Sequence, residues 1–105
     1  GIEPLALASG VRSSYYKYIA MLDPKLDRSR LKALLDNEYD VRLGGEVYDT
    51  PLHLQPIFRG SHREGDFPNA EDICRRHICL PLSAAMTVEE AQYVVASLRE
   101  AVGRL

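Results

Sequence analysis

The stretch YYKYIAMLDPKLDRSRLKALLDNEY, residues 15–39, decides the fold, because it contains a strand, a break and a capped helix in succession. Its aromatic and apolar beginning, residues 15–22, predicts a β-strand, which Asp23-Pro24 ends. Asp27 is the predicted N-cap of the following helix, because its side-chain oxygen can accept from the free amides of the first turn. Apolar residues then recur at helical spacing, so this helix has one apolar face.

Two further segments follow this helix. Residues 41–48 predict a second strand, which the paired glycines Gly44-Gly45 interrupt. Glycines inside a strand indicate a bulge or a close backbone approach. Residues 49–66 form a connection rich in Pro, Gly and His. Because an irregular loop of this length in a small domain is either functional or mobile, binding residues are expected in it.

The last third of the chain predicts a helix, a strand and a final helix. Residues 66–77 form the first of these helices and residues 77–82 the strand, which Pro81 places at a sheet edge or near its end. Thr87-Val-Glu-Glu90 is a capping box that begins the final helix. The core-facing stripe of that helix is expected to consist of Ala91, Val94, Val95, Leu98 and Val102.

The expected order is therefore β-α-β-loop-α-β-α, an α+β fold in which helices pack on a sheet of about three strands. Residues 15–105 form this domain, and a chain of 105 residues corresponds to one domain. Residues 1–14 are weakly patterned and contain Pro4 and Gly10. A linker, or the trailing edge of a preceding domain, is expected there.

Composition excludes several classes of function. The net charge is −2, whereas a nucleic-acid partner requires a basic face. No apolar run approaches the roughly 20 residues that span a bilayer, and the amino terminus lacks the basic region of a signal peptide. The two cysteines, Cys74 and Cys79, are too few for a disulfide scaffold and favour free thiols in a cytoplasmic protein.

The long connection carries the main candidate binding residue. His53 lies between Pro51 and Pro56, which restrict the backbone on both sides. Its imidazole can donate a hydrogen bond to a phosphate or to a sugar hydroxyl, and Arg42 or Arg59 can pair with an anion. The alternative is a loop histidine that is hydrogen-bonded to the backbone, and the residues alone favour this simpler interpretation.

Neither a metal site nor a nucleophile is expected. No CxxC or HExxH spacing occurs, and there is no GxSxG elbow. Cys74 and His77 share one helix face, but that face is the expected apolar one. A buried, inert thiol and a helix-capping histidine are therefore expected at these positions.

Four segments together resemble the small domain of the DegT/StrS-type sugar aminotransferases. They are SSYYKYIAMLDP (13–24), VRLGGEVYDTPLHLQPIF (41–58), FPNAEDICRRHICLPLSAAMT (67–87) and EEAQYVVASLREAV (89–102). Enzymes of this family are PLP-dependent homodimers of fold type I, with active sites at the dimer interface. They transfer an amino group, usually from glutamate or glutamine, to the ketone of a nucleotide-linked sugar or a cyclitol.

The resemblance implies a C-terminal small domain that closes the active site, as a fragment of a longer enzyme. The partner of such a domain is the large N-terminal domain, which holds the cofactor. His53 matches the loop histidine of the family and is expected near the sugar or its phosphate. Tyr48 and Gln55 lie in the same run and are further candidates for substrate binding. GGEVYD departs from the more common Gly-Ile/Val-His-Tyr-Pro form of this loop, which leaves open whether the substrate is a nucleotide sugar or a cyclitol.

Lysine bears directly on this implied activity, because PLP is held covalently by a lysine in a dry pocket. The chain offers only Lys17, Lys25 and Lys32, which lie in a predicted strand, in a turn and on the polar face of a helix. No catalytic or cofactor-binding residue is therefore expected in these 105 residues, and the chain alone is expected to be inactive. The alternative is a stand-alone, non-catalytic binding module of the same fold.

Overall fold

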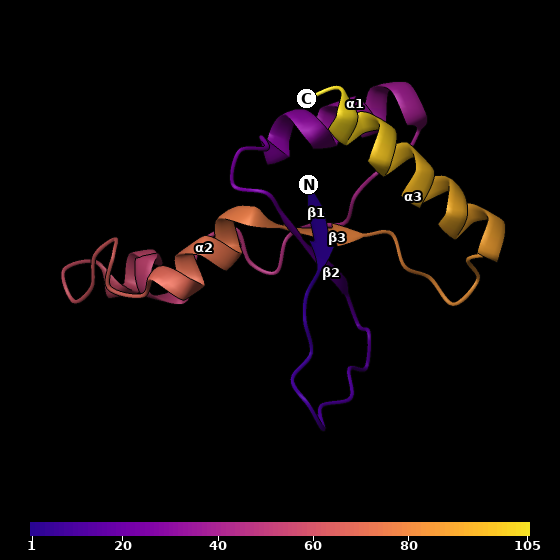
Figure 1. Ribbon diagram of the computed structural model, residues 1–105. Coiled ribbons are helices and arrows are strands. Elements are labelled where there is room, and N and C mark those ends of the chain that lie inside the picture. The colour runs from indigo at the N-terminus through magenta and orange to yellow at the C-terminus, as the bar shows by residue number, and fades with distance from the viewer.

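The computed structural model describes residues 1–105, and its centre is a three-stranded antiparallel sheet in the order β1-β2-β3 (Figure 1). Helices α1 and α3 cover one face of this sheet, and α2 runs away from it. The expected α+β class is confirmed, although the order of elements is β-β-α-α-β-α. The elements are β1 (Ile2–Pro4), β2 (Tyr18–Leu22), α1 (Arg28–Tyr39), α2 (Pro68–Arg76), β3 (His77–Leu80) and α3 (Val88–Gly103).

The hydrophobic core lies between the sheet and helices α1 and α3. Alternate residues of a strand point to opposite faces, so Ala20 and Leu22 of β2 and Ile78 of β3 face the helices. Leu31 and Leu35 of α1 pack against them and have no exposed surface. Helix α3 completes the core with Leu98 and Ala101.

Residues 41–48 do not form the predicted strand. Only Gly44 pairs with the sheet, where its N–H donates to the carbonyl oxygen of Cys79 at 2.9 Å in an isolated bridge. The close backbone approach that the glycines indicate is present, since a Cβ on Gly44 would lie 3.4 Å from the Cβ of Cys79. The ladder goes no further because the Val47 N–H donates to the His77 side chain instead.

The third strand lies instead within residues 1–14, where the sequence predicts a linker or trailing edge. Ile2–Pro4 pairs antiparallel with β2, and Ile2 lies opposite Leu22. A strand this short carries almost no periodicity, which is why its pattern is not recognisable in the sequence. It forms because β2 would otherwise present a free row of backbone donors and acceptors along that edge.

The helix boundaries follow their predicted caps. The Asp27 carboxylate accepts from the Arg30 N–H at 2.9 Å, and Thr87 and Glu90 form both bonds of the capping box. The stripe of α3 is partly different from the prediction, because Ala91 and Val95 are exposed whereas Ser97 and Ala101 are buried. The C-terminal half of α3 packs on α1 and the sheet, and its N-terminal half projects beyond them (Figure 1).

Two segments project from this body (Figure 1). One is the connection between β1 and β2, residues 5–17. The other, called the arm below, is residues 49–76, and it contains the 3-10 turns Leu52–Leu54 and Pro56–Phe58 followed by α2. The Cα radius of gyration is 15.4 Å, against about 13 Å for a compact domain of this size. None of the helices has both the length and the apolar character needed to cross a bilayer.

Candidate functional site

His53 is held in the arm by its backbone neighbours. Pro51 is extended and precedes the 3-10 turn Leu52–Leu54, whose last N–H donates to the Pro51 carbonyl at 3.0 Å. Because proline fixes its own φ, the chain enters this turn in a narrow range of directions. The turn buries the His53 side chain, which is only 7% exposed.

Glu71 of α2 fixes the imidazole of His53. The His53 Nε2 atom lies 2.8 Å from a Glu71 carboxylate oxygen, which also accepts from the backbone N–H of Gly65 at 2.9 Å. Partial burial of Glu71 works against its ionisation, but the bonds from Gly65, His53 and Phe67 outweigh it, so the pKa of Glu71 lies below its ordinary value. The carboxylate therefore joins three separate parts of the arm, and His53 is bonded to a side chain rather than to the backbone.

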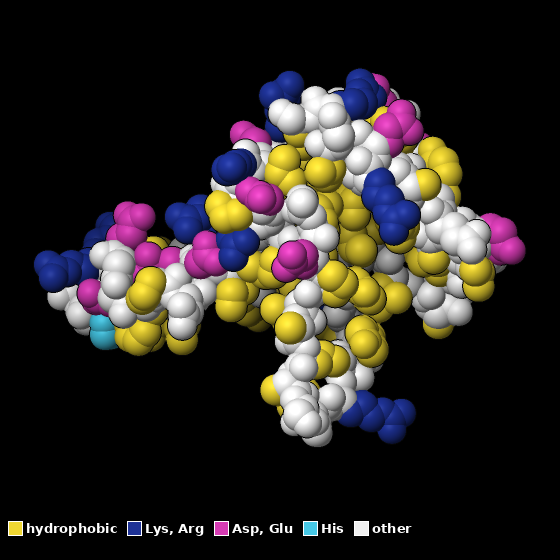
Figure 2. Space-filling model, viewed as in Figure 1, with side chains coloured by type: hydrophobic (Ala, Val, Ile, Leu, Met, Phe, Trp, Pro, Cys, Tyr) yellow, Lys and Arg dark blue, Asp and Glu magenta, His cyan; other side chains and the backbone are white.

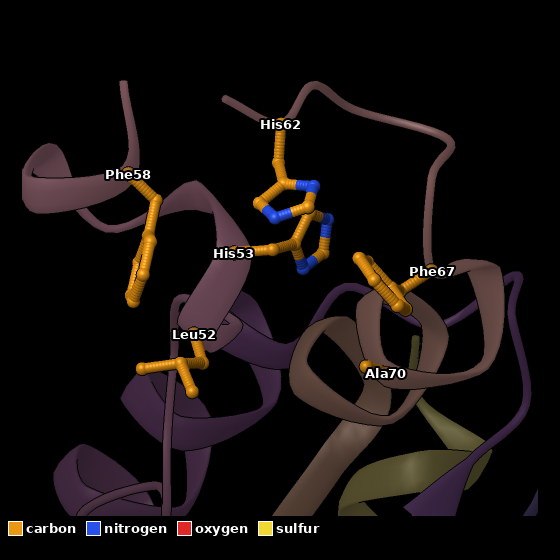
Figure 3. A pocket seen from close by; sticks show the side chains of 6 residues that line it. All are labelled: Leu52, His53, Phe58, His62, Phe67 and Ala70. Carbon is orange, nitrogen blue, oxygen red and sulfur yellow. The ribbon is translucent and has the colours of Figure 1, made fainter. Parts of the chain in front are cut away.

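A pocket of about 310 Å³ opens beside this pair (Figure 3). The His53 ring lies 4.8 Å from the ring of Phe67, and the His62 ring lies 5.6 Å from it. Figure 3 shows Phe58 and Phe67 on opposite sides of His53, with Leu52 below. The lining is mostly apolar and consists of Leu52, His53, Phe58, His62, Phe67 and Ala70.

The other sequence-predicted residues do not line this pocket. Tyr48 is 72% exposed, and the Gln55 side-chain amide donates to the Thr50 carbonyl at 3.0 Å. Arg42 pairs with Asp36, and Arg59 is exposed outside the lining. The structure thus brings only His53 of the predicted set into the pocket.

Three lining rings, Phe58, His62 and Phe67, were not identified from the sequence. Their signal is visible in retrospect, since Phe67 directly precedes the helix-starting Pro68 and all three are aromatic rings in a loop otherwise rich in charge and glycine. Spacing alone did not show that they converge, because the arm folds back on itself between Phe58 and Phe67.

Arg28 ties the arm to the body of the domain. Its guanidinium donates to the backbone carbonyls of Cys74 at 2.8 Å and His77 at 3.1 Å, at the end of α2. It also pairs with the Asp49 carboxylate at 2.6 Å, at the start of the arm. One side chain of α1 therefore holds both ends of the arm.

His77 reinforces this junction and confirms the predicted helix-capping role. Its Nδ1 lies 2.7 Å from the Ile73 carbonyl oxygen, which can only accept, so Nδ1 carries the proton. The Nε2 atom is then free to accept from the Val47 N–H at 2.9 Å. Cys74 is only half-buried, so the expectation of a buried thiol at that position is wrong. The buried thiol is that of Cys79 in β3, and burial raises its pKa.

The lysines of this chain do not fit covalent attachment of PLP. Lys32 Nζ lies 2.7 Å from the carboxylate of Glu46, which holds it in an ion pair. Lys25 is exposed, and Lys17 borders a hollow of about 110 Å³, well below the volume of about 300 Å³ at which ligand sites begin. No lysine lines the pocket of the arm.

Comparisons with known proteins extend this description. The sequence profile of the DegT/DnrJ/EryC1/StrS aminotransferase family matches residues 1–99. The spore coat polysaccharide biosynthesis protein SpsC of Bacillus subtilis is 29% identical over 96 residues, which is 87% of this chain and 24% of that protein. The dTDP-4-dehydro-2,3,6-trideoxy-D-glucose 4-aminotransferase of Saccharopolyspora spinosa is 30% identical over 103 residues, which is 94% of this chain and 24% of that protein.

A solved structure shares the fold. The aminotransferase TlmJ from Streptoalloteichus hindustanus superposes with a TM-score of 0.75 and 28% sequence identity, over 99% of this chain and 27% of that chain. The present chain thus spans about a quarter of the length of the relatives that it matches.

Proposed function

The chain belongs to the DegT/DnrJ/EryC1/StrS aminotransferase family, and from this premise we propose that it is the C-terminal small domain of a longer sugar aminotransferase. The parent enzyme transfers an amino group from glutamate or glutamine to the ketone of a nucleotide-linked sugar or a cyclitol, with PLP as cofactor. The observation that carries the proposal is the family match over residues 1–99, in a chain that covers about a quarter of its relatives.

The names of the relatives support a sugar substrate. The protein from Saccharopolyspora spinosa is a 4-aminotransferase of a dTDP-linked deoxysugar, and the protein from Bacillus subtilis is named for polysaccharide biosynthesis. Both matches cover nearly the whole of this chain. A sugar aminotransferase of deoxysugar or surface-polysaccharide synthesis is therefore the parent that we propose.

PLP in this enzyme is held outside the present residues, because none of Lys17, Lys25 and Lys32 fits its attachment. When bound, PLP supplies the electron sink that amino transfer requires. This chain supplies binding surface, chiefly the arm with His53. The exposed Tyr48 is available to a ligand or a second chain, whereas Gln55 acts on the arm itself through its bond to Thr50.

The assembly that we propose is a cytoplasmic homodimer in which the arm contributes to a site shared with the rest of the enzyme. The exposed apolar side chains of the arm support this, since Leu52 is 73% exposed and Ile57 is 84% exposed. Figure 2 shows hydrophobic side chains gathered along one side of the arm. Exposed apolar patches of this kind mark interaction surfaces.

The intact mass of the native gene product tests the proposal. A product several times heavier, which binds PLP on a lysine outside these residues and aminates a keto-sugar, is the expected result. A product of only this mass would exclude catalysis and leave a stand-alone binding module. PLP titration of the 105-residue chain is the second test, because a saturable absorbance band that borohydride reduction fixes on a lysine would contradict the proposal.

A further inference from the structure

The pocket of the arm is built for an uncharged ring rather than for a phosphate. The His53 Nε2 atom lies 2.8 Å from the Glu71 carboxylate, so this nitrogen is already bonded to an acidic group. The Glu71 carboxylate also accepts from the backbone N–H of Gly65, which both oxygens share, and from that of Phe67. Its negative charge would repel an anion. Neither Arg59 nor Arg63 is among the lining residues.

The aromatic rings in the lining of the pocket offer flat surfaces to a planar group. Aromatic rings approach it from different elements, with Phe58 on a 3-10 turn and Phe67 immediately before α2. Figure 3 shows these two rings on opposite sides of the imidazoles of His53 and His62. At about 310 Å³ the pocket is at the lower end of ligand sites. It therefore has room for one ring system and not for a whole nucleotide sugar.

His62 offers a polar group to such a ring. His62 is 42% exposed, and its Nδ1 lies 3.6 Å from the Asp66 carboxylate, beyond hydrogen-bond distance. Its ring contacts Phe67 edge-on at 5.6 Å. His62 can thus hydrogen-bond to the polar edge of a heterocycle whose face lies against the phenylalanines.

We propose that the pocket formed by Phe58, His62 and Phe67 binds the heterocyclic base of the nucleotide part of the substrate. This inference rests on the proposed sugar aminotransferase function and makes it more specific, because a cyclitol has no base and would leave the pocket empty. Bases stack on aromatic side chains because every base has a π-face. The His53–Glu71 pair then supports the wall of the pocket and does not contact a phosphate.

Equilibrium titration of the native gene product with thymidine, followed by NMR, tests this proposal. We expect saturable binding that Phe58→Leu and Phe67→Leu each weaken about tenfold. Tenfold is 1.4 kcal/mol, which lies within the range for the loss of one stacking partner. Ile57→Ala is the matched control, because Ile57 is 84% exposed on the same arm and does not line the pocket, so thymidine binding should be unchanged. Circular dichroism verifies that each variant is folded.

Several outcomes would overturn the inference. They are the absence of thymidine binding, thymidine binding that neither phenylalanine variant weakens, and displacement of thymidine by inorganic phosphate. The transamination assay separates this inference from the proposed function. Turnover of a nucleotide-linked keto-sugar without thymidine binding at the pocket refutes the inference alone, whereas thymidine binding without any transamination refutes the proposed function alone.

Discussion

Replacement of Arg28 by methionine should detach the arm from the body of the domain. The substitution removes two charge-assisted bonds to the carbonyls of Cys74 and His77, at 2.8 and 3.1 Å. A hydrogen bond to a charged group contributes about 1.5–3 kcal/mol. Since one guanidinium makes both bonds in a half-buried position, their contributions are not additive. We therefore expect the free energy of unfolding to fall by about 3 kcal/mol.

Arg28 makes two ion pairs, one with the largely buried Glu46 at 3.9 Å and one with Asp49, and the exposed pair with Asp49 provides the matched control. Asp49 pairs with the same guanidinium at 2.6 Å, but its side chain is 64% exposed. An exposed ion pair contributes about 0–1 kcal/mol, so Asp49→Asn should cost less than about 1 kcal/mol. The loss of stability in Arg28→Lys should lie between those of the other two variants, because lysine keeps the charge but lacks the planar guanidinium that reaches two carbonyls.

Urea unfolding measures these losses, and amide hydrogen exchange locates them. In Arg28→Met the amides of Gly65 and Phe67, which donate to Glu71, should exchange faster than those of the β2 strand. The reasoning is refuted if Arg28→Met and Asp49→Asn lower stability equally. It is also refuted if the arm and the sheet lose exchange protection together, because the arm would then not be a separately held unit.

Three further predictions concern titration and packing. The pKa of Glu71 is lowered, so the bonds of its carboxylate to the arm stabilise the fold fully above the ordinary pKa of 4.5 and are lost as the pH falls through the lower folded value. Amide exchange of Gly65 should accelerate in that acidic range. Glu71→Gln should remove this pH-dependent transition. The hydrogen bonds from Arg76 and Arg75 hold the pKa of Asp72 at about 2, and Arg76→Met should raise it toward 3.8 in an NMR titration. Leu35 has no exposed surface, so Leu35→Ala should lower the free energy of unfolding by about 2–5 kcal/mol. Ile57→Ala should change it by less than about 0.5 kcal/mol.

The local sequence was sufficient to predict where helices α1 and α3 begin. Asp27 and the Thr87–Glu90 capping box mark helix starts because each cap is satisfied within one turn of the chain. The long connection of residues 49–66 was also recognisable from its prolines and glycines, and it contains only short 3-10 turns. These features need no distant partner, which is why their prediction holds in the structure.

Strand pairing and the pocket depended on contacts between distant residues. Ile2–Pro4 forms a strand because it pairs with the edge of β2. Residues 41–48 do not form a strand, because the Val47 N–H donates to the His77 side chain and not to the sheet. His53 meets Glu71 across the folded arm, and this bond occupies the Nε2 atom of the imidazole. A sequence specifies which groups can form bonds over short range, whereas the partner that satisfies a buried polar group is decided only when the tertiary structure brings distant residues together.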